Sequence, residues 1–149
     1  MARTATEPGA TRCAWACRVD HAIEWLGMLD HEQVLQALEQ AQVFLLPSRY
    51  EGMSNAGLEA MERGLAIVMT RCGGLDTYVQ PNMGWVVEPE DSAALAAALS
   101  QAIRATTARL SAMGESCRAC VLQNFDLAAV ATRYLELFES VLSAGREGR

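Results

Sequence analysis

The amino-acid sequence predicts an α/β domain in which helices cover both faces of a parallel sheet. Two continuous apolar runs, Val43 to Leu46 and Ala66 to Thr70, are typical of strands that are buried on both sides. The first run leads through a loop into a segment with helix-start signals, so strands and helices alternate along the chain. With 149 residues, the chain has the length of one domain and can bury a substantial core.

The composition narrows the classes of function. The net charge of −6 argues against nucleic acid as a partner, because phosphate backbones select a basic surface. All 12 basic residues are arginine, and no lysine occurs. No apolar run reaches the ~18 residues that a membrane span needs. Five cysteines, an odd number, without a secretory signal fit a reducing compartment, so we expect a cytoplasmic protein.

The first part of the chain contains three expected segments. Residues 1–18 show no period, and we expect a disordered or non-native tail there. Ala22 to Leu26 is a short apolar run that predicts a strand, which Gly27 ends. Asp30 and Gln33 have the spacing of a capping box, so a helix follows. The expected buried stripe of that helix comprises Val34, Leu35, Leu38 and Ala41.

The stretch after Val43 to Leu46 holds the candidate site. Pro47 ends the strand, because proline cannot donate to a sheet ladder. Gly52 gives backbone freedom to the loop that follows. Ser54 is a good N-cap for a helix that runs to about Arg63. The loop therefore lies at the carboxyl end of a parallel strand and the amino end of a helix, where open α/β sheets bind ligands.

Two glutamates mark this strand, loop and helix. Glu51 lies in the loop, and Glu59 follows eight residues later on the helix. A carboxylate is an acceptor that can hold both hydroxyls of a vicinal diol. The free N–H groups of the first helical turn, Ser54 to Gly57, can receive an anion or a sugar hydroxyl. Two diol binders on either side of an anion-binding helix start suit a ligand with two sugars joined by phosphate, which is a nucleotide-sugar.

The second half of the chain supplies the remaining strands and helices. After Ala66 to Thr70, Gly73 and Gly74 form a second ligand-side loop in which backbone can come close to a ligand. Gly84 to Val87 predicts a last strand, ended by Pro89.

Three helices complete the predicted fold. The first is capped by Asp91 or Ser92, the second spans about Thr107 to Gln123, and the third begins at Asp126. In the helix capped by Asp91 or Ser92, the side chains expected in the core are Leu95, Leu99, Ala102 and Ile103. The stripe expected in the core from the last helix comprises Leu127, Val130, Tyr134, Leu137, Phe138 and Val141.

The cysteines raise the question of a metal site. Cys13 and Cys17 could combine with Cys117 and Cys120 to hold zinc. The helical spacing favours a different interpretation, because Cys117 and Cys120 fall on the apolar side of their helix, where cysteines act as small core residues. We therefore expect no metal and no cofactor.

The stretch around the two glutamates also resembles a known family. From Pro47 to Met61 the chain reads Pro-Ser-x-x-Glu-Gly-x-Ser-Asn-x-x-Leu-Glu-Ala-Met, and Gly64-Leu65, a strand and Gly73-Gly74 come next. This string is similar to the carboxyl-terminal domain of family 4 glycosyltransferases of the GT-B fold. The resemblance covers about Val19 to Phe138, so we expect the domain at 19–143, with tails at 1–18 and 144–149.

The resemblance implies a Rossmann-like three-layer domain, the second of the two in a GT-B enzyme, that binds a nucleoside diphosphate sugar. In that family the glutamate that matches Glu51 binds hydroxyls of the donor sugar, and the glutamate that matches Glu59 binds the ribose. Glu51 is thereby the candidate catalytic residue. The implied donor-binding residues are Glu51, Gly52, Met53, Ser54, Asn55, Glu59, Gly27, Met28, Gly73 and Gly74. For Gly27, a simple turn is an equal alternative to contact with the base.

The chain also departs from the family pattern. Thr77 stands where the family usually has glutamate, and Ala66 where it usually has proline. The arginine and lysine that hold the diphosphate in the family lie upstream of the matched segment and have no counterpart here. Arg49 and Arg71 lie near the ligand-side loops but match neither, and we expect them to be solvated surface residues.

By this resemblance the chain comes from a retaining hexosyltransferase that moves a sugar to a hydroxyl of an acceptor glycan, lipid or small molecule. The longer enzyme would be cytoplasmic or peripheral to the membrane. Because the acceptor site belongs to the amino-terminal GT-B domain, we expect the isolated chain to be inactive. Two alternatives stay open: a non-catalytic nucleotide-sugar-binding fragment, or a domain of another GT-B enzyme such as an epimerase or a phosphorylase. The context of Ser54 and Asn55 favours the transferase.

The resemblance also predicts an exposed sheet edge. In the strand order 3-2-1-4-5-6, Ala22 to Leu26 matches strand 3 and Val43 to Leu46 matches strand 4. Strands 1 and 2, which should lie between them, have no counterpart, because the tail at 1–18 is too short for two strand–helix units. We expect a bare edge on Val43 to Leu46, an under-packed last helix, marginal stability and self-association.

Overall fold

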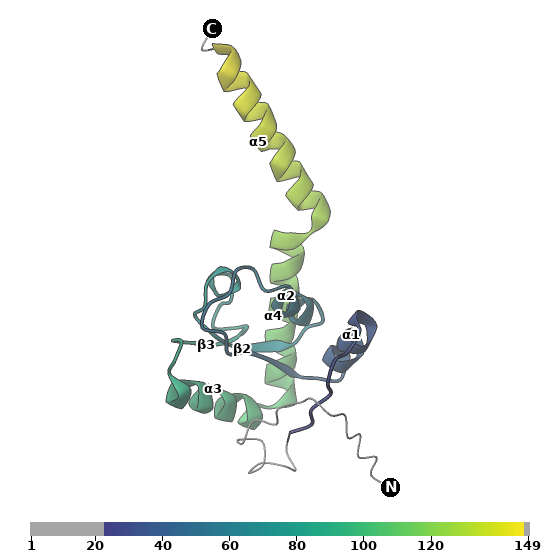
Figure 1. Ribbon diagram of the computed structural model, residues 1–149, viewed down its shortest axis with the longest axis vertical. Coiled ribbons are helices and arrows are strands. Elements are labelled where there is room, and N and C mark those ends of the chain that lie inside the picture. The colour runs from purple at the N-terminus through teal and green to yellow at the C-terminus, as the bar shows by residue number, and fades with distance from the viewer. Residues whose placement is uncertain (1–22, 148–149) are drawn as a thin grey trace.

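The sheet has three parallel strands in the order β1-β2-β3. A computed structural model describes residues 23–147, with side chains through 143. Strand β1 spans Val43–Leu46, β2 spans Ala66–Thr70 and β3 spans Gly84–Val87 (Figure 1). Val43 pairs with Ala66 and Ile67 pairs with Gly84, so β2 lies in the centre of the sheet. These three strands and the α/β class are confirmed with the bounds that the sequence predicts.

The helices begin at the capping residues that the sequence indicates. The structure contains α1 (His31–Glu39), α2 (Asn55–Glu62), the 3-10 helix η2 (Gly74–Thr77), α3 (Ser92–Arg104), α4 (Thr107–Phe125) and α5 (Leu127–Glu147). Asp30 and Gln33 form the complete capping box of α1, and the N-caps Ser54 and Asp91 each accept a bond from a backbone N–H in the first turn. The carboxyl end of α2 is followed by Gly64 at φ 76°, a left-handed position that suits glycine.

Helices cover both faces of the sheet around β2, all five residues of which are buried. On one face, Ile67 and Met69 join Met61 of α2 and Cys117 of α4 in the main core cluster. On the other face, Val68 packs with small side chains of α3. The result is the three-layer arrangement that two-sided burial of a parallel sheet requires.

The prediction of a strand at Ala22 to Leu26 is wrong for Ile23 to Leu26, which is the part that the structure describes. Residues 23–26 have no regular structure, and the side chain of Trp25 is 86% exposed, while Ala22 lies outside the described residues. A strand is stabilised by its neighbours, and the strands that would separate this run from β1 have no counterpart in the sequence. Within residues 23–147, the outer edge of β1 therefore has no strand beside it, as expected.

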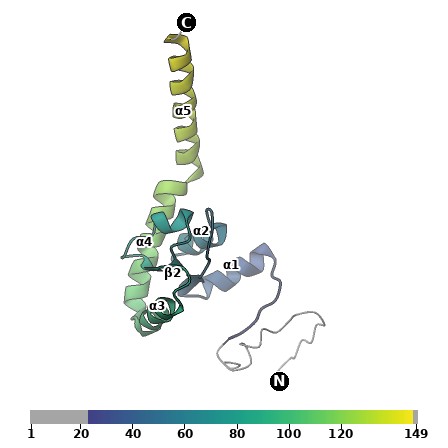
Figure 2. The ribbon, with the colours of Figure 1, turned by 60° about the vertical axis from the view of Figure 1, so that its left-hand side comes forward.

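The prediction that the last segment forms a helix is confirmed. The prediction that its apolar stripe lies in the core is wrong. Its apolar stripe is exposed, from Leu127 at 82% to Phe138 at 59%, with only Val130 half-buried. In both views α5 extends away from the sheet and the other helices (Figures 1 and 2). This fits the expected under-packing of the helix. Two smaller errors have the same origin: Ile103 on α3 is exposed, and Ala41 lies exposed beyond the end of α1. A period shows which side chains share a face but not whether anything covers that face.

Candidate functional site

The two loops at the carboxyl ends of β1 and β2 are packed against each other. The backbone N–H of Glu51 donates to the carbonyl of Cys72 at 2.8 Å. A Cβ atom at Gly73 would lie 2.9 Å from the carbonyl oxygen of Glu51, and one at Gly74 would overlap the carbonyl of Gly52. Both glycines also have positive φ, of 98° and 68°. The contact between the loops therefore requires glycine at both positions, which is how Gly73 and Gly74 take part in the site.

The carboxylate of Glu51 is oriented by its own loop. Ser48 Oγ donates to Glu51 Oε2 at 3.1 Å, and the Glu51 side chain is half-buried. The loop is tied to β2 through Thr70, whose hydroxyl is in contact with the carbonyl oxygens of Ser48 and, at 3.4 Å, of Leu46. Because the Ser48 hydroxyl occupies one acceptor site, the remaining lone pairs of Glu51 stay available for a ligand.

The start of α2, three residues after Glu51 in the chain, supplies backbone donors. Ser54 is buried, and its Oγ accepts from Gly57 N at 3.2 Å. The N-terminal N–H groups before Gly57 have no partner inside the helix, which leaves them free for an anion or a hydroxyl. Met53 and Asn55 on either side of Ser54 are exposed, so a ligand can approach this turn.

Glu59 lies one turn further along α2 and is half-buried. Among the described residues, its carboxylate accepts no hydrogen bond, although its backbone carbonyl accepts from Arg63 Nη1 at 3.3 Å. The two predicted glutamates thus come from one loop and one helix, and both keep acceptor capacity. Gly27 and Met28 do not join them through any contact found within residues 23–147. Met28 is fully exposed, and a Cβ at Gly27 would meet nothing within 4 Å.

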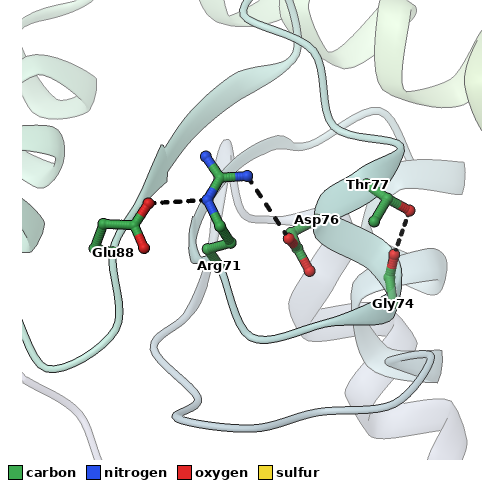
Figure 3. Close-up of polar contacts among 5 residues, drawn as sticks. All are labelled: Arg71, Gly74, Asp76, Thr77 and Glu88. Carbon is green, nitrogen blue, oxygen red and sulfur yellow. Dashed lines mark hydrogen bonds and ion pairs between the residues drawn. The ribbon is translucent and has the colours of Figure 1, made fainter.

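A buried carboxylate in the second loop is a feature that the sequence reasoning missed. Asp76 on η2 is 7% exposed, and its Oδ1 has no hydrogen-bond partner among the described residues. Its Oδ2 lies 4.0 Å from Arg71, whose Nε donates to Glu88 at 2.9 Å (Figure 3). The hydrogen bond to Glu88 raises the pKa of Arg71. The only sequence signal for Asp76 is its position two residues after Gly74.

The two candidate arginines near these loops are exposed and paired with carboxylates. Arg49 lies 3.2 Å from Glu90, and both side chains are largely exposed. Arg71 reaches from the end of β2 to Glu88, beyond the end of β3. Exposed pairs of this kind contribute little to stability, which agrees with the expected surface role.

Cys117 and Cys120 are core residues, as their spacing predicts. The thiol of Cys117 lies 3.4 Å from the carbonyl oxygen of Met83, and that of Cys120 lies 3.8 Å from the carbonyl oxygen of Tyr78. Burial raises the pKa of the Cys117 thiol to about 12. Zinc binds the thiolate, which this environment disfavours. Residues 23–147 contain no group of three metal-ligating side chains, and Cys13 and Cys17 lie outside the described residues.

The fold and these loops define the class of protein, an α/β domain of the kind that forms the carboxyl-terminal half of GT-B enzymes. The family described as "Glycosyl transferases group 1" matches residues 5–105, and the chain belongs to this family. Within residues 23–147, none of the helices has both the length and the apolar character needed to cross a bilayer.

Curated relatives agree with this assignment. The chain is 31% identical over 122 residues to a glycogen synthase of Mycobacterium tuberculosis, covering 81% of this chain and 29% of the relative. It is 30% identical over 131 residues to the putative colanic acid biosynthesis glycosyltransferase WcaL of Salmonella typhimurium, covering 83% of this chain and 32% of the relative. The chain thus spans about a third of the length of these relatives.

Solved structures share the fold. A sucrose-phosphate synthase from Thermosynechococcus elongatus superposes with a TM-score of 0.74 at 29% identity, covering 87% of this chain and 33% of that chain. HepE from Anabaena, solved in complex with UDP-glucose, gives 0.71 at 21% identity and covers 84% of this chain and 35% of that chain. The predicted Rossmann-like GT-B architecture is therefore confirmed.

Proposed function

We propose that this chain binds a nucleoside diphosphate sugar, as the donor-binding domain of a retaining hexosyltransferase. The observation that carries the proposal is the contact between the Glu51 loop and the Gly73–Gly74 loop, together with a Glu51 carboxylate that lies three residues before the N-cap of α2. Family membership favours a transferase over an epimerase or a phosphorylase. The UDP-glucose complex of HepE supports this class of ligand by analogy of fold.

Each part of the donor has a proposed partner. Glu51, held by Ser48, accepts hydroxyls of the sugar next to the bond that breaks. The amides of Met53, Ser54 and Asn55 receive the diphosphate, where the positive end of the α2 dipole stabilises the charge that develops on the leaving group. Glu59 accepts both hydroxyls of the ribose. Gly27 and Met28 remain proposed neighbours of the base.

Calorimetric titration of two ligands against two variants tests these roles. Glu59→Ala is expected to weaken binding of the free nucleoside diphosphate by ~1.5–3 kcal/mol, the range for a hydrogen bond to a charged group. Glu51→Ala is expected to weaken binding of the nucleotide-sugar and leave the free nucleotide nearly unchanged. Glu62→Ala is the matched control, because Glu62 is an exposed glutamate on the same helix. Equal losses for both ligands in the Glu51 variant would refute the assignment.

Transfer itself is proposed to need a second domain. The site lies at the carboxyl ends of the strands. A dry, closed cleft with an acceptor site requires a second surface that faces these strand ends. The purified 149-residue chain is therefore expected to show no transfer and at most slow hydrolysis of the donor. Robust transfer to any acceptor by this chain alone would contradict the proposal. Full donor affinity without turnover in any longer form would instead favour the non-catalytic alternative.

A further inference from the structure

A hollow in the surface lies away from the two glutamates. It has a volume of about 430 Å³, within the range of ligand pockets, and lies between the segment 77–83 and the second half of α4. It begins at Thr77, the last residue of η2, and extends to Asn124 near the end of α4. We call it the amide groove. Because η2 starts at Gly74, the amide groove begins where the second ligand-side loop ends.

The lining of the amide groove mixes polar and apolar groups and carries no charged side chain. Its polar groups are the carboxamides of Gln80, Asn82, Gln123 and Asn124 and the hydroxyls of Thr77 and Ser116, among others. A carboxamide both donates and accepts hydrogen bonds, and so does a hydroxyl. Such a lining suits a neutral polyhydroxylated ligand, whereas an anion or a cation would find no counter-charge.

Part of the lining is fixed in place by hydrogen bonds. Asn82 Nδ2 donates to Ser116 Oγ at 3.2 Å, and Asn124 Nδ2 donates to the carbonyl of Cys120 at 2.9 Å. Asn124 Nδ2 also donates to Cys120 Sγ at 3.6 Å, and both amides keep their carbonyl oxygens as oriented acceptors. The ring of Tyr78 is held edge-on against Phe125, with centroids 4.8 Å apart, and adds a half-buried aromatic surface.

Two other carboxamides remain free to adapt to a ligand. Gln80 and Gln123 are exposed, and within residues 23–147 no hydrogen bond engages either side chain. Fixed acceptors, adaptable carboxamides and an aromatic surface are the groups that recognise a sugar ring, since each ring offers adjacent hydroxyls and an apolar face.

We propose that the amide groove is a carbohydrate-binding site for a neutral glycan, separate from the donor site. One end of the amide groove, at Thr77, adjoins η2 and thereby the Gly73–Gly74 loop. A chain held there raises the local concentration of sugar hydroxyls near the site. The inference does not depend on donor binding, because the amide groove shares neither Glu51 nor Glu59.

The test is a titration of the ¹⁵N-labelled full chain with neutral oligosaccharides of glucose and of mannose, followed by NMR. The side-chain amide signals of Gln80 and Gln123 are expected to shift on addition of at least one oligosaccharide. The double variant Gln80→Ala/Gln123→Ala is expected to bind about tenfold more weakly, because two hydrogen bonds are removed. Both residues are exposed, so the variant keeps its fold, which the spectrum itself verifies.

Controls separate this site from the donor site. Gln36→Ala removes an exposed carboxamide on α1 and is expected to leave oligosaccharide binding unchanged. Glu59→Ala is expected to weaken the nucleotide and leave the oligosaccharide unchanged. The inference is overturned if no neutral oligosaccharide shifts these signals, or if the double variant binds as well as the original chain. Tighter binding of an acidic uronate oligosaccharide than of its neutral counterpart would also overturn it.

Discussion

The strand β2 and the helix α5 show opposite outcomes from equally clear sequence patterns. Every residue of β2 is buried between two strands and two helical layers. The helix α5 has a regular apolar stripe, yet most of that stripe is exposed, and the helix extends away from the sheet (Figure 2). The difference teaches that a pattern determines the element and its faces, while burial depends on what else the chain can bring to those faces.

The same contrast separates the packed ligand-side loops from the exposed edge of β1 and the exposed stripe of α5. The Gly73–Gly74 loop is fixed by close backbone contact with the Glu51 loop, so a change there disturbs both loops. The edge of β1 and the stripe of α5 have no such contacts among residues 23–147. Variants in the first region should therefore have large effects, and variants in the second should have small effects on stability.

Among substitutions in the ligand-side loops, the largest effect is expected for Gly74→Val. Its Cβ would overlap the carbonyl of Gly52, and φ of 68° is strained for a β-branched residue. We expect a loss of about 2–4 kcal/mol in the free energy of unfolding, measured by urea denaturation, together with loss of nucleotide binding. Gly52→Ala is the control for stability, because a Cβ there meets nothing within 4 Å. Equal effects of the two substitutions would show that the loops are not packed as described.

The second prediction concerns the stability of the chain at high pH, which depends on Cys117 on the buried face of α4. The pKa of Cys117 is raised from 9.0 to about 12, so the folded chain holds this proton more tightly than the unfolded chain. Its contribution to stability is complete below pH 9 and is lost as the pH rises toward about 12. The urea midpoint should therefore fall above pH 9. The decrease of the urea midpoint above pH 9 should be smaller in Cys117→Ala than in the original chain. In Cys72→Ala most of the decrease should remain. A pH profile that is the same in both variants would contradict the buried position of Cys117.

A smaller effect is expected from the ion pairs at the loop ends. Glu88→Gln removes the partner of Arg71, and both side chains are more than half exposed. The urea midpoint should drop slightly, less than in Gly74→Val, and the drop should shrink at high salt. Arg71→Gln should cost more than Glu88→Gln, because Asp76 then loses the cation nearest its buried carboxylate. The reverse order would show that Asp76 does not depend on Arg71.

The smallest effect on stability is expected on α5. The double variant Leu137→Glu/Phe138→Glu places charges on side chains that are already exposed, so the free energy of unfolding should stay within about 0.5 kcal/mol of the original. Because exposed apolar stripes and bare strand edges favour association, sedimentation should show less self-association in this variant. Val68→Glu in β2 provides the contrast and should unfold the chain. A large loss of stability in the α5 variant would show that the stripe is covered in solution.

Much of the candidate site could be predicted from the sequence, because its signals are local. The spacing of Glu51 and Glu59, the cap Ser54 and the pair Gly73 and Gly74 are each visible within a few residues. The bond from Ser48 that orients Glu51 and the burial of Asp76 were not visible. Gly27 and Met28 were predicted near the base, and no contact within residues 23–147 connects them to the loops.

The sequence by itself determined the strands β1, β2 and β3, the starts of the helices and the candidate glutamates. The strands and helix starts depend on periodicity or capping, which involve residues at most four positions apart, and the glutamates depend on a motif with eight-residue spacing. Only the tertiary structure decided that Ile23 to Leu26 forms no strand, that α5 is exposed and that the two ligand-side loops meet. These outcomes depend on partners far along the chain, such as Cys72 for Glu51, and on whether a neighbouring strand or surface exists to complete the contact.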